Sequence, residues 1–136
     1  MRQLLSEPSN EVFISLLSLA EVSAAFSICV RRGKLEQRQG RLAYHAFVSD
    51  VVGGKYRLVP AALSIVVHAA DLTQQHPLKG YDAVQVASGL ALDRAIESEG
   101  LELIFVSSDQ QVLNAAEAEE LMMVNPHEHT EENERD

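Results

Sequence analysis

Short apolar runs alternate with longer segments of helical spacing along this chain. Runs of about four apolar residues between turn signals are typical of short buried strands, and apolar positions three or four residues apart predict helices. The predicted strands are 12–15, 56–59, 103–106 and 121–124, and the predicted helices are 18–33, 36–52, 61–76, 82–98 and 108–116. Strands separated by helices predict an α/β fold, in which helices cover both faces of a parallel sheet.

The length and the apolar content fit one globular domain. The chain has 136 residues, of which 46% are hydrophobic, and no run approaches the roughly 20 apolar residues of a membrane span. Glu7 and Pro8 interrupt any apolar region of a signal peptide. The single cysteine, Cys29, excludes an internal disulfide and a multi-cysteine zinc site. We therefore expect a cytoplasmic protein without a membrane partner.

Charge is unevenly distributed. The formal net charge is −9, and the segment 127–136 contains five acids and one arginine, which places −4 there and −5 on the rest. We expect 1–126 to form the domain and 127–136 to be an acidic disordered tail. Five basic residues lie close together in the body: Arg31, Arg32, Lys34, Arg38 and Arg41. They form either a local positive surface for the phosphates of a nucleic acid or solvated helix ends.

Three acids stand where predicted strands give way to helices. Glu21 follows the first strand, Asp82 opens the alanine-rich helix, and Asp109 comes soon after the third strand, with Ser107 just before it. Ligands of open α/β sheets bind beyond the carboxyl ends of the strands. Carboxylates that converge there need a cation between them, and hard oxygen ligands favour Mg²⁺ or Mn²⁺. Each acid also has a purely structural interpretation, as a helix cap or a first-turn acid.

Six segments occur in an order that resembles PIN domains. They are Leu19–Val22, Arg32–Leu35, His76–Ser88, Phe105–Asp109, Leu113–Ala116 and Val124–Pro126. The most specific is His76–Ser88, HPLKGYDAVQVAS. Over about residues 4–126 the chain resembles the VapC-type toxins, which are metal-dependent ribonucleases of toxin–antitoxin pairs.

The resemblance implies a three-layer fold and a site for Mg²⁺ or Mn²⁺. It places Glu21, Asp82 and Asp109 at three acidic positions of the family's metal site, and Ser107 at a hydroxyl position beside the last acid. It further implies an RNA substrate, an antitoxin partner and a homodimer. For the RNA we expect contacts from Arg31, Arg32, Lys34 and Arg38.

One feature of the family is missing from this sequence. Members begin with a central strand that ends in an aspartate, the first acid of the site, whereas residues 2–9 resemble the segment that follows that strand. Three explanations stay open: a translation start further upstream, a degenerate copy, or a strand supplied by another chain.

Two functional hypotheses follow. In the first, the protein is a divalent-metal-dependent ribonuclease with Glu21, Asp82 and Asp109 as metal ligands. In the second, it is a catalytically impaired PIN-like module that binds RNA or an antitoxin-like protein without cleavage. A receiver-type phosphoacceptor domain is a distant third possibility, because it requires paired acids directly after the first strand and none stand there.

Overall fold

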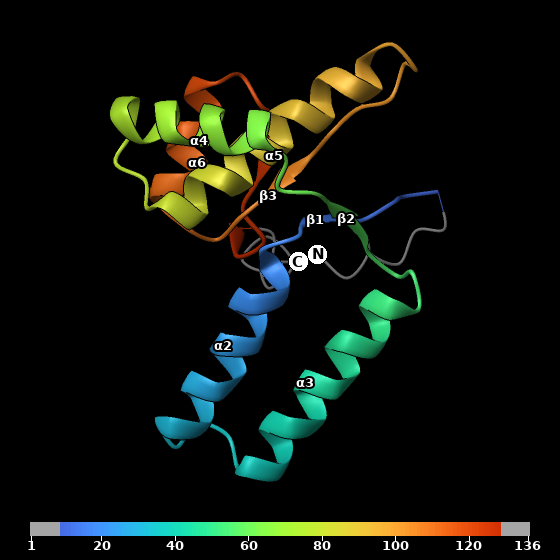
Figure 1. The fold of residues 1–136 in the computed structure, drawn as a ribbon, viewed down its shortest axis with the longest axis vertical. Coiled ribbons are helices and arrows are strands. Elements are labelled where there is room, and N and C mark those ends of the chain that lie inside the picture. Colours follow the sequence, from blue (N-terminus) through green and yellow to red (C-terminus); the bar gives the residue numbers. More distant parts are fainter. Residues whose placement is uncertain (1–8, 129–136) are drawn as a thin grey trace, which may run out of the picture. The chain divides into compact units, whose positions relative to one another are not determined.

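The computed structural model describes residues 9–128 and divides them after Pro60 into two compact units, which we treat separately (Figure 1). The segment 1–8, which holds most of the family-like stretch 2–9, lies outside the described residues. The same is true of 129–136, most of the predicted acidic tail. Within 9–128, no helix combines the length and the apolar character needed to cross a membrane.

The unit 9–60 consists of two short parallel strands and a helical hairpin. Its elements are β1 (Phe13–Ser15), α2 (Ser18–Arg31), α3 (Gln37–Val52) and β2 (Arg57–Val59). β1 pairs with β2 in parallel, so that Phe13 lies opposite Arg57 and Ser15 opposite Val59. Helices α2 and α3 contact each other and run in opposite directions (Figure 1).

Local sequence explains the turn between α2 and α3. Gly33 adopts a φ of +70°, which favours glycine and ends α2. Glu36 begins α3 with a capping box, in which the side chain of Gln39 accepts a hydrogen bond from the Glu36 backbone N–H. Gly40 is buried where the helices meet, and a Cβ there would overlap the Val30 side chain. The hairpin therefore depends on a residue without a side chain at this position.

The unit 61–128 contains the larger core. Its elements are α4 (Leu63–Gln75), α5 (Gly80–Glu97), β3 (Phe105–Val106), α6 (Gln110–Ala118) and β4 (Met123–Val124). α5 contacts both α4 and α6, and β3 pairs in parallel with β4. Each helix contributes buried apolar residues, among them Leu72, Val86 and Val112. Gly89 brings α5 close to Phe105, because a Cβ there would lie 2.9 Å from the Phe105 ring.

The structure confirms the α/β class and all the predicted helices and strands. The third and fourth predicted strands are shorter than expected. Only Phe105 and Val106 of the run 103–106 are paired, and only Met123 and Val124 of the run 121–124. The described strands form two separate parallel pairs, β1–β2 and β3–β4. Ile104, just before β3, and Val106 within it are 40% and 42% exposed, whereas a continuous apolar run predicts a strand buried on both faces.

Candidate functional site

Asp82 lies in the first turn of α5, where its side chain is half-buried. Lys79 is the N-cap of this helix, so the cap interpretation of Asp82 is wrong. In the segment His76–Ser88, the apolar residues Ala83, Val86 and Ala87 are fully buried. The polar residues of this segment therefore lie on the other sides of the first turns of α5. Among them Gln85 donates a hydrogen bond of 2.5 Å to the Tyr81 hydroxyl.

Asp109 is the N-cap of α6 and comes shortly after the carboxyl end of β3. Its Oδ1 accepts hydrogen bonds from the backbone N–H groups of Gln111 and Val112, at 2.9 and 3.3 Å. The Ser107 hydroxyl accepts from the Asp109 backbone N–H at 3.1 Å, and so fixes the turn that leads into the helix. Within 9–128, Oδ2 of the exposed Asp109 makes no hydrogen bond, which leaves one carboxylate oxygen for a ligand.

A contact that was not predicted from the sequence joins the C-terminal ends of α4 and α6. His76, the C-cap of α4, contacts Glu119, the C-cap of α6, with 2.8 Å between Nε2 and Oε1. The two side chains are 17% and 26% exposed. They are 43 positions apart in the chain, so no local pattern could have paired them. The contact fixes α6 against the segment that precedes α5.

Glu21 belongs to the other unit. It lies in the first turn of α2, shortly after β1, and is exposed. This agrees with the predicted position at the end of a strand and the start of a helix. The three predicted acids are thus divided between the units, and only Asp82 and Asp109 share one. In the part of the chain that the structure describes, no three His, Cys, Asp or Glu side chains are grouped as a metal site.

The basic cluster lies at the turn of the α2–α3 hairpin. Its members are exposed, and within 9–128 none forms an ion pair with a carboxylate: Arg31, Arg32, Lys34, Arg38 and Arg41. The other two basic residues of this unit are paired, Lys55 with Asp50 and Arg57 with Glu11, at 3.2 and 3.0 Å. The hydrogen bond that Lys55 donates to Asp50 raises the pKa of Lys55. The cluster therefore holds the cations of the unit that remain available to an anionic partner.

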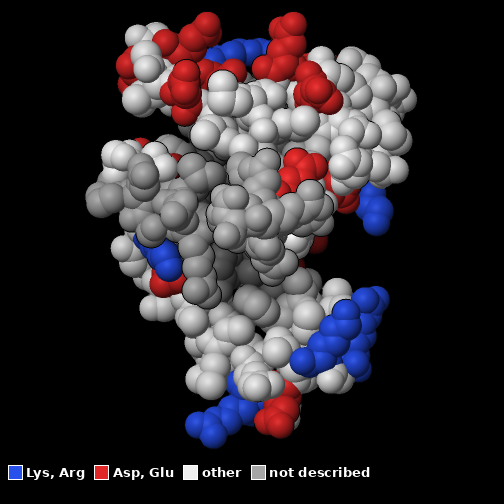
Figure 2. All heavy atoms as spheres, turned by 180° about the vertical axis from the view of Figure 1, so that it is seen from behind, with Lys and Arg blue, Asp and Glu red and all other residues white. Residues whose placement is uncertain are grey.

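The two units differ in charge. Residues 9–60 contain seven Lys or Arg and four Asp or Glu, a net +3, whereas 61–128 contain two and eleven, a net −9. Figure 2 shows the excess of blue side chains over the α2–α3 hairpin. The described part of the first unit, 9–60, is therefore positive although the whole chain has a net charge of −9.

Comparison with known proteins gives no family assignment. No protein-family model matches the chain, and no curated protein matches it.

Proposed function

We propose that the protein is a divalent-metal-dependent ribonuclease of the PIN and VapC type, with a three-layer fold. The observation that carries the proposal is the position of Asp109, just beyond the carboxyl end of a parallel strand, in a unit that also presents Asp82 at the start of a contacting helix. Ligands bind at this end of the strands in open α/β folds. Glu21 lies in the first turn of α2, the helix that follows β1.

The donor set fits a hard cation. Asp82, Asp109 and Glu21 offer carboxylate oxygens, the ligands that Mg²⁺ and Mn²⁺ prefer. Asp109 uses Oδ1 for the helix cap and keeps Oδ2 for an ion, while Ser107 orients the turn on which this carboxylate stands. When bound, the ion lowers the pKa of a coordinated water and offsets the negative charge of the phosphodiester.

The charge distribution supports an RNA substrate. The cluster at the hairpin turn supplies cations that form no ion pair within the described residues 9–128. Backbone phosphates bind proteins largely through such positive charges.

We further propose an antitoxin-like partner and a homodimer. α4 exposes apolar residues at helical spacing, with Leu63 79%, Val66 43% and Val67 54% exposed. An apolar stripe of this kind is typical of a surface that another protein covers. We propose that α4 packs against α4 of a second copy.

The decisive experiment removes one charge from the proposed site. We expect Asp82→Asn to abolish Mg²⁺- or Mn²⁺-dependent cleavage of single-stranded RNA while the circular-dichroism spectrum stays unchanged. Asp93→Asn is the matched control, because Asp93 lies on the same helix about 16 Å further along. Equal cleavage by parent and Asp82→Asn would remove the proposed site.

The alternative function is that of a PIN-like module that binds RNA without cutting it. It is favoured by one observation, that no three metal-binding side chains are grouped within 9–128. This alternative predicts that the parent binds RNA with the same affinity in Mn²⁺ and in a chelator, and cleaves it in neither. Replacing Arg31 and Arg32 together by glutamine would weaken that binding under both conditions.

A further inference from the structure

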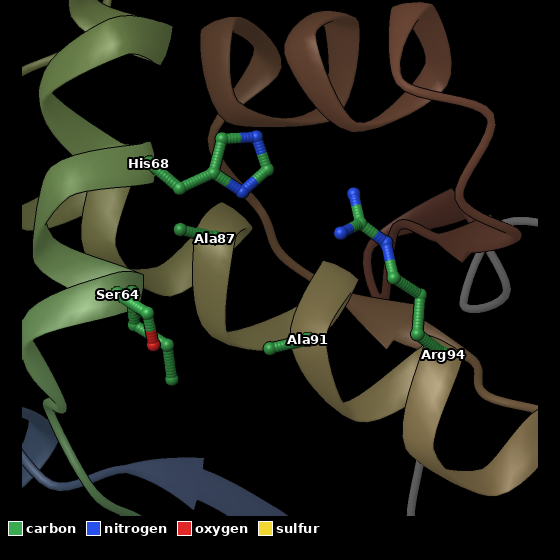
Figure 3. Close-up of a pocket in the computed structure, with 6 residues that line it drawn as sticks. Ser64, His68, Ala87, Ala91 and Arg94 are labelled. Atoms are coloured by element: carbon green, nitrogen blue, oxygen red, sulfur yellow. The ribbon is translucent and has the colours of Figure 1, made fainter.

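A pocket of about 250 Å³ opens between α4 and α5, inside the unit 61–128. Its lining residues are Ser64, Ile65, His68, Ala87, Ala91 and Arg94. Ser64 and His68 are one turn apart on α4, and Ala87, Ala91 and Arg94 follow one face of α5. Figure 3 shows the His68 ring and the Arg94 guanidinium extending from α4 and α5 toward a common space, whereas the Ser64 hydroxyl points away from that space.

The floor of the pocket is apolar and its edges carry hydrogen-bond donors. Ala87 is fully buried, and the small alanine side chains leave the space that a larger residue would fill. Arg94 is exposed at one edge, and His68 is half-buried at the other. The site therefore combines an apolar surface with nitrogen donors from His68 and Arg94.

Arg94 and His68 face no carboxylate partner within 9–128, although the unit 61–128 is rich in acids. Arg94 and Lys79 are the only Lys or Arg of 61–128, against eleven Asp and Glu. Within 9–128, neither Arg94 nor His68 makes an ion pair or a side-chain hydrogen bond. Arginine binds carboxylates readily through two parallel hydrogen bonds. Arg94 instead remains available at the edge of a pocket.

We propose that this pocket binds a terminal phosphate monoester attached to a small apolar or aromatic body. The outer oxygens of a phosphate monoester can accept two parallel hydrogen bonds from the Arg94 guanidinium and a further one from the His68 ring, which face the same space. The volume lies slightly below the range of drug-sized sites, which fits a group of about one nucleotide rather than a larger ligand.

The pocket is separate from the candidate metal site. Arg94 lies twelve positions beyond Asp82 on α5, about 18 Å along the helix axis. The inference goes beyond the proposed function, because binding of the phosphate requires neither a metal ion nor cleavage. A free mononucleotide and the phosphorylated end of an RNA strand share this chemistry.

Binding to the full chain can be measured by NMR titration in a phosphate-free buffer that contains a chelator. The ligands are 5′-AMP, adenosine and inorganic phosphate, and a pair of short RNAs that differ only in a 5′-phosphate or a 5′-hydroxyl. We expect 5′-AMP to bind saturably and adenosine at least about 10-fold more weakly, since the phosphate makes the charged hydrogen bonds. The amide signals of Ala87 and Ala91 should shift.

Three variants test the donors. Arg94→Gln should weaken 5′-AMP binding about 10-fold or more, and Arg94→Lys should recover part of the loss, because lysine keeps the charge without the planar fork. His68→Leu should also weaken binding. Lys79→Gln is the control, since it removes the other positive charge of 61–128 and does not line the pocket.

The RNA pair identifies the source of the phosphate. Tighter binding of the 5′-phosphorylated strand than of the 5′-hydroxyl strand assigns the pocket to RNA ends, and equal binding of the two strands together with saturable binding of 5′-AMP assigns it to free nucleotides. Equal affinity for 5′-AMP and adenosine, or an equal effect of Arg94→Gln and Lys79→Gln, would overturn the proposal. Loss of RNA cleavage in Asp82→Asn with unchanged 5′-AMP binding separates this site from the proposed nuclease site.

Discussion

Asp109 carries two proposed roles that different substitutions can separate. As a helix cap, its Oδ1 accepts hydrogen bonds from two backbone N–H groups at the start of α6. As a metal ligand, it would need its negative charge. Asparagine caps helices about as well as aspartate but is a much weaker ligand for Mg²⁺ or Mn²⁺. Alanine serves neither role.

The expected stability changes follow from the cap geometry. Asp109→Ala should lower the free energy of unfolding by about 1 kcal/mol, whereas Asp109→Asn should lower it by a few tenths. With a dependence of about 2 kcal/mol per molar urea, the alanine variant unfolds at about 0.5 M less urea. The cost is expected because α6 buries Val112, Leu113, Ala115 and Ala116 against the rest of its unit.

The second measurement is the increase in the free energy of unfolding that Mn²⁺ binding produces. At a Mn²⁺ concentration 100 times the dissociation constant, binding to the folded state alone stabilises the parent by about 2.7 kcal/mol. We expect this increase in the parent, and little of it in either Asp109 variant. Urea unfolding followed by circular dichroism, with Mn²⁺ or with a chelator, measures both effects. An equal gain from Mn²⁺ in the parent and in Asp109→Asn would show that Asp109 is only a cap.

Other predictions concern packing and association. Gly40→Ala should destabilise the hairpin by about 1 kcal/mol in urea unfolding, because the added Cβ overlaps Val30. In a Val30→Ala background this overlap is removed, so the same change should stabilise the hairpin through the better helix propensity of alanine. A double-mutant cycle of His76→Ala and Glu119→Ala should give a coupling energy of about 0.5–1.5 kcal/mol, which salt reduces only in part. If the stability losses of the two single variants simply add in the double variant, the 2.8 Å contact contributes nothing to stability. Val67→Asp should shift a dimer toward monomer in sedimentation, whereas an unchanged mass would remove α4 as the dimer surface.

Local signals in the sequence determined the elements of the fold. Periodicity and end signals placed α2, where Gly33 stops the helix, and α3, where Gly53 follows its last residue. They also placed Asp109 at the start of α6 and Glu21 in the first turn of α2. These features depend on residues a few positions apart, so a single sequence is sufficient to find them.

Contacts between distant residues were decided only by the tertiary structure. The pairing of His76 with Glu119 spans 43 positions, and the pocket joins Ser64 and His68 to Arg94 across two helices. The arrangement of the strands as two separate pairs likewise depends on which backbone groups meet in space. The periodicity of a sequence does not encode such contacts. They form when apolar faces of different elements pack together, which brings the polar side chains beside those faces close to one another.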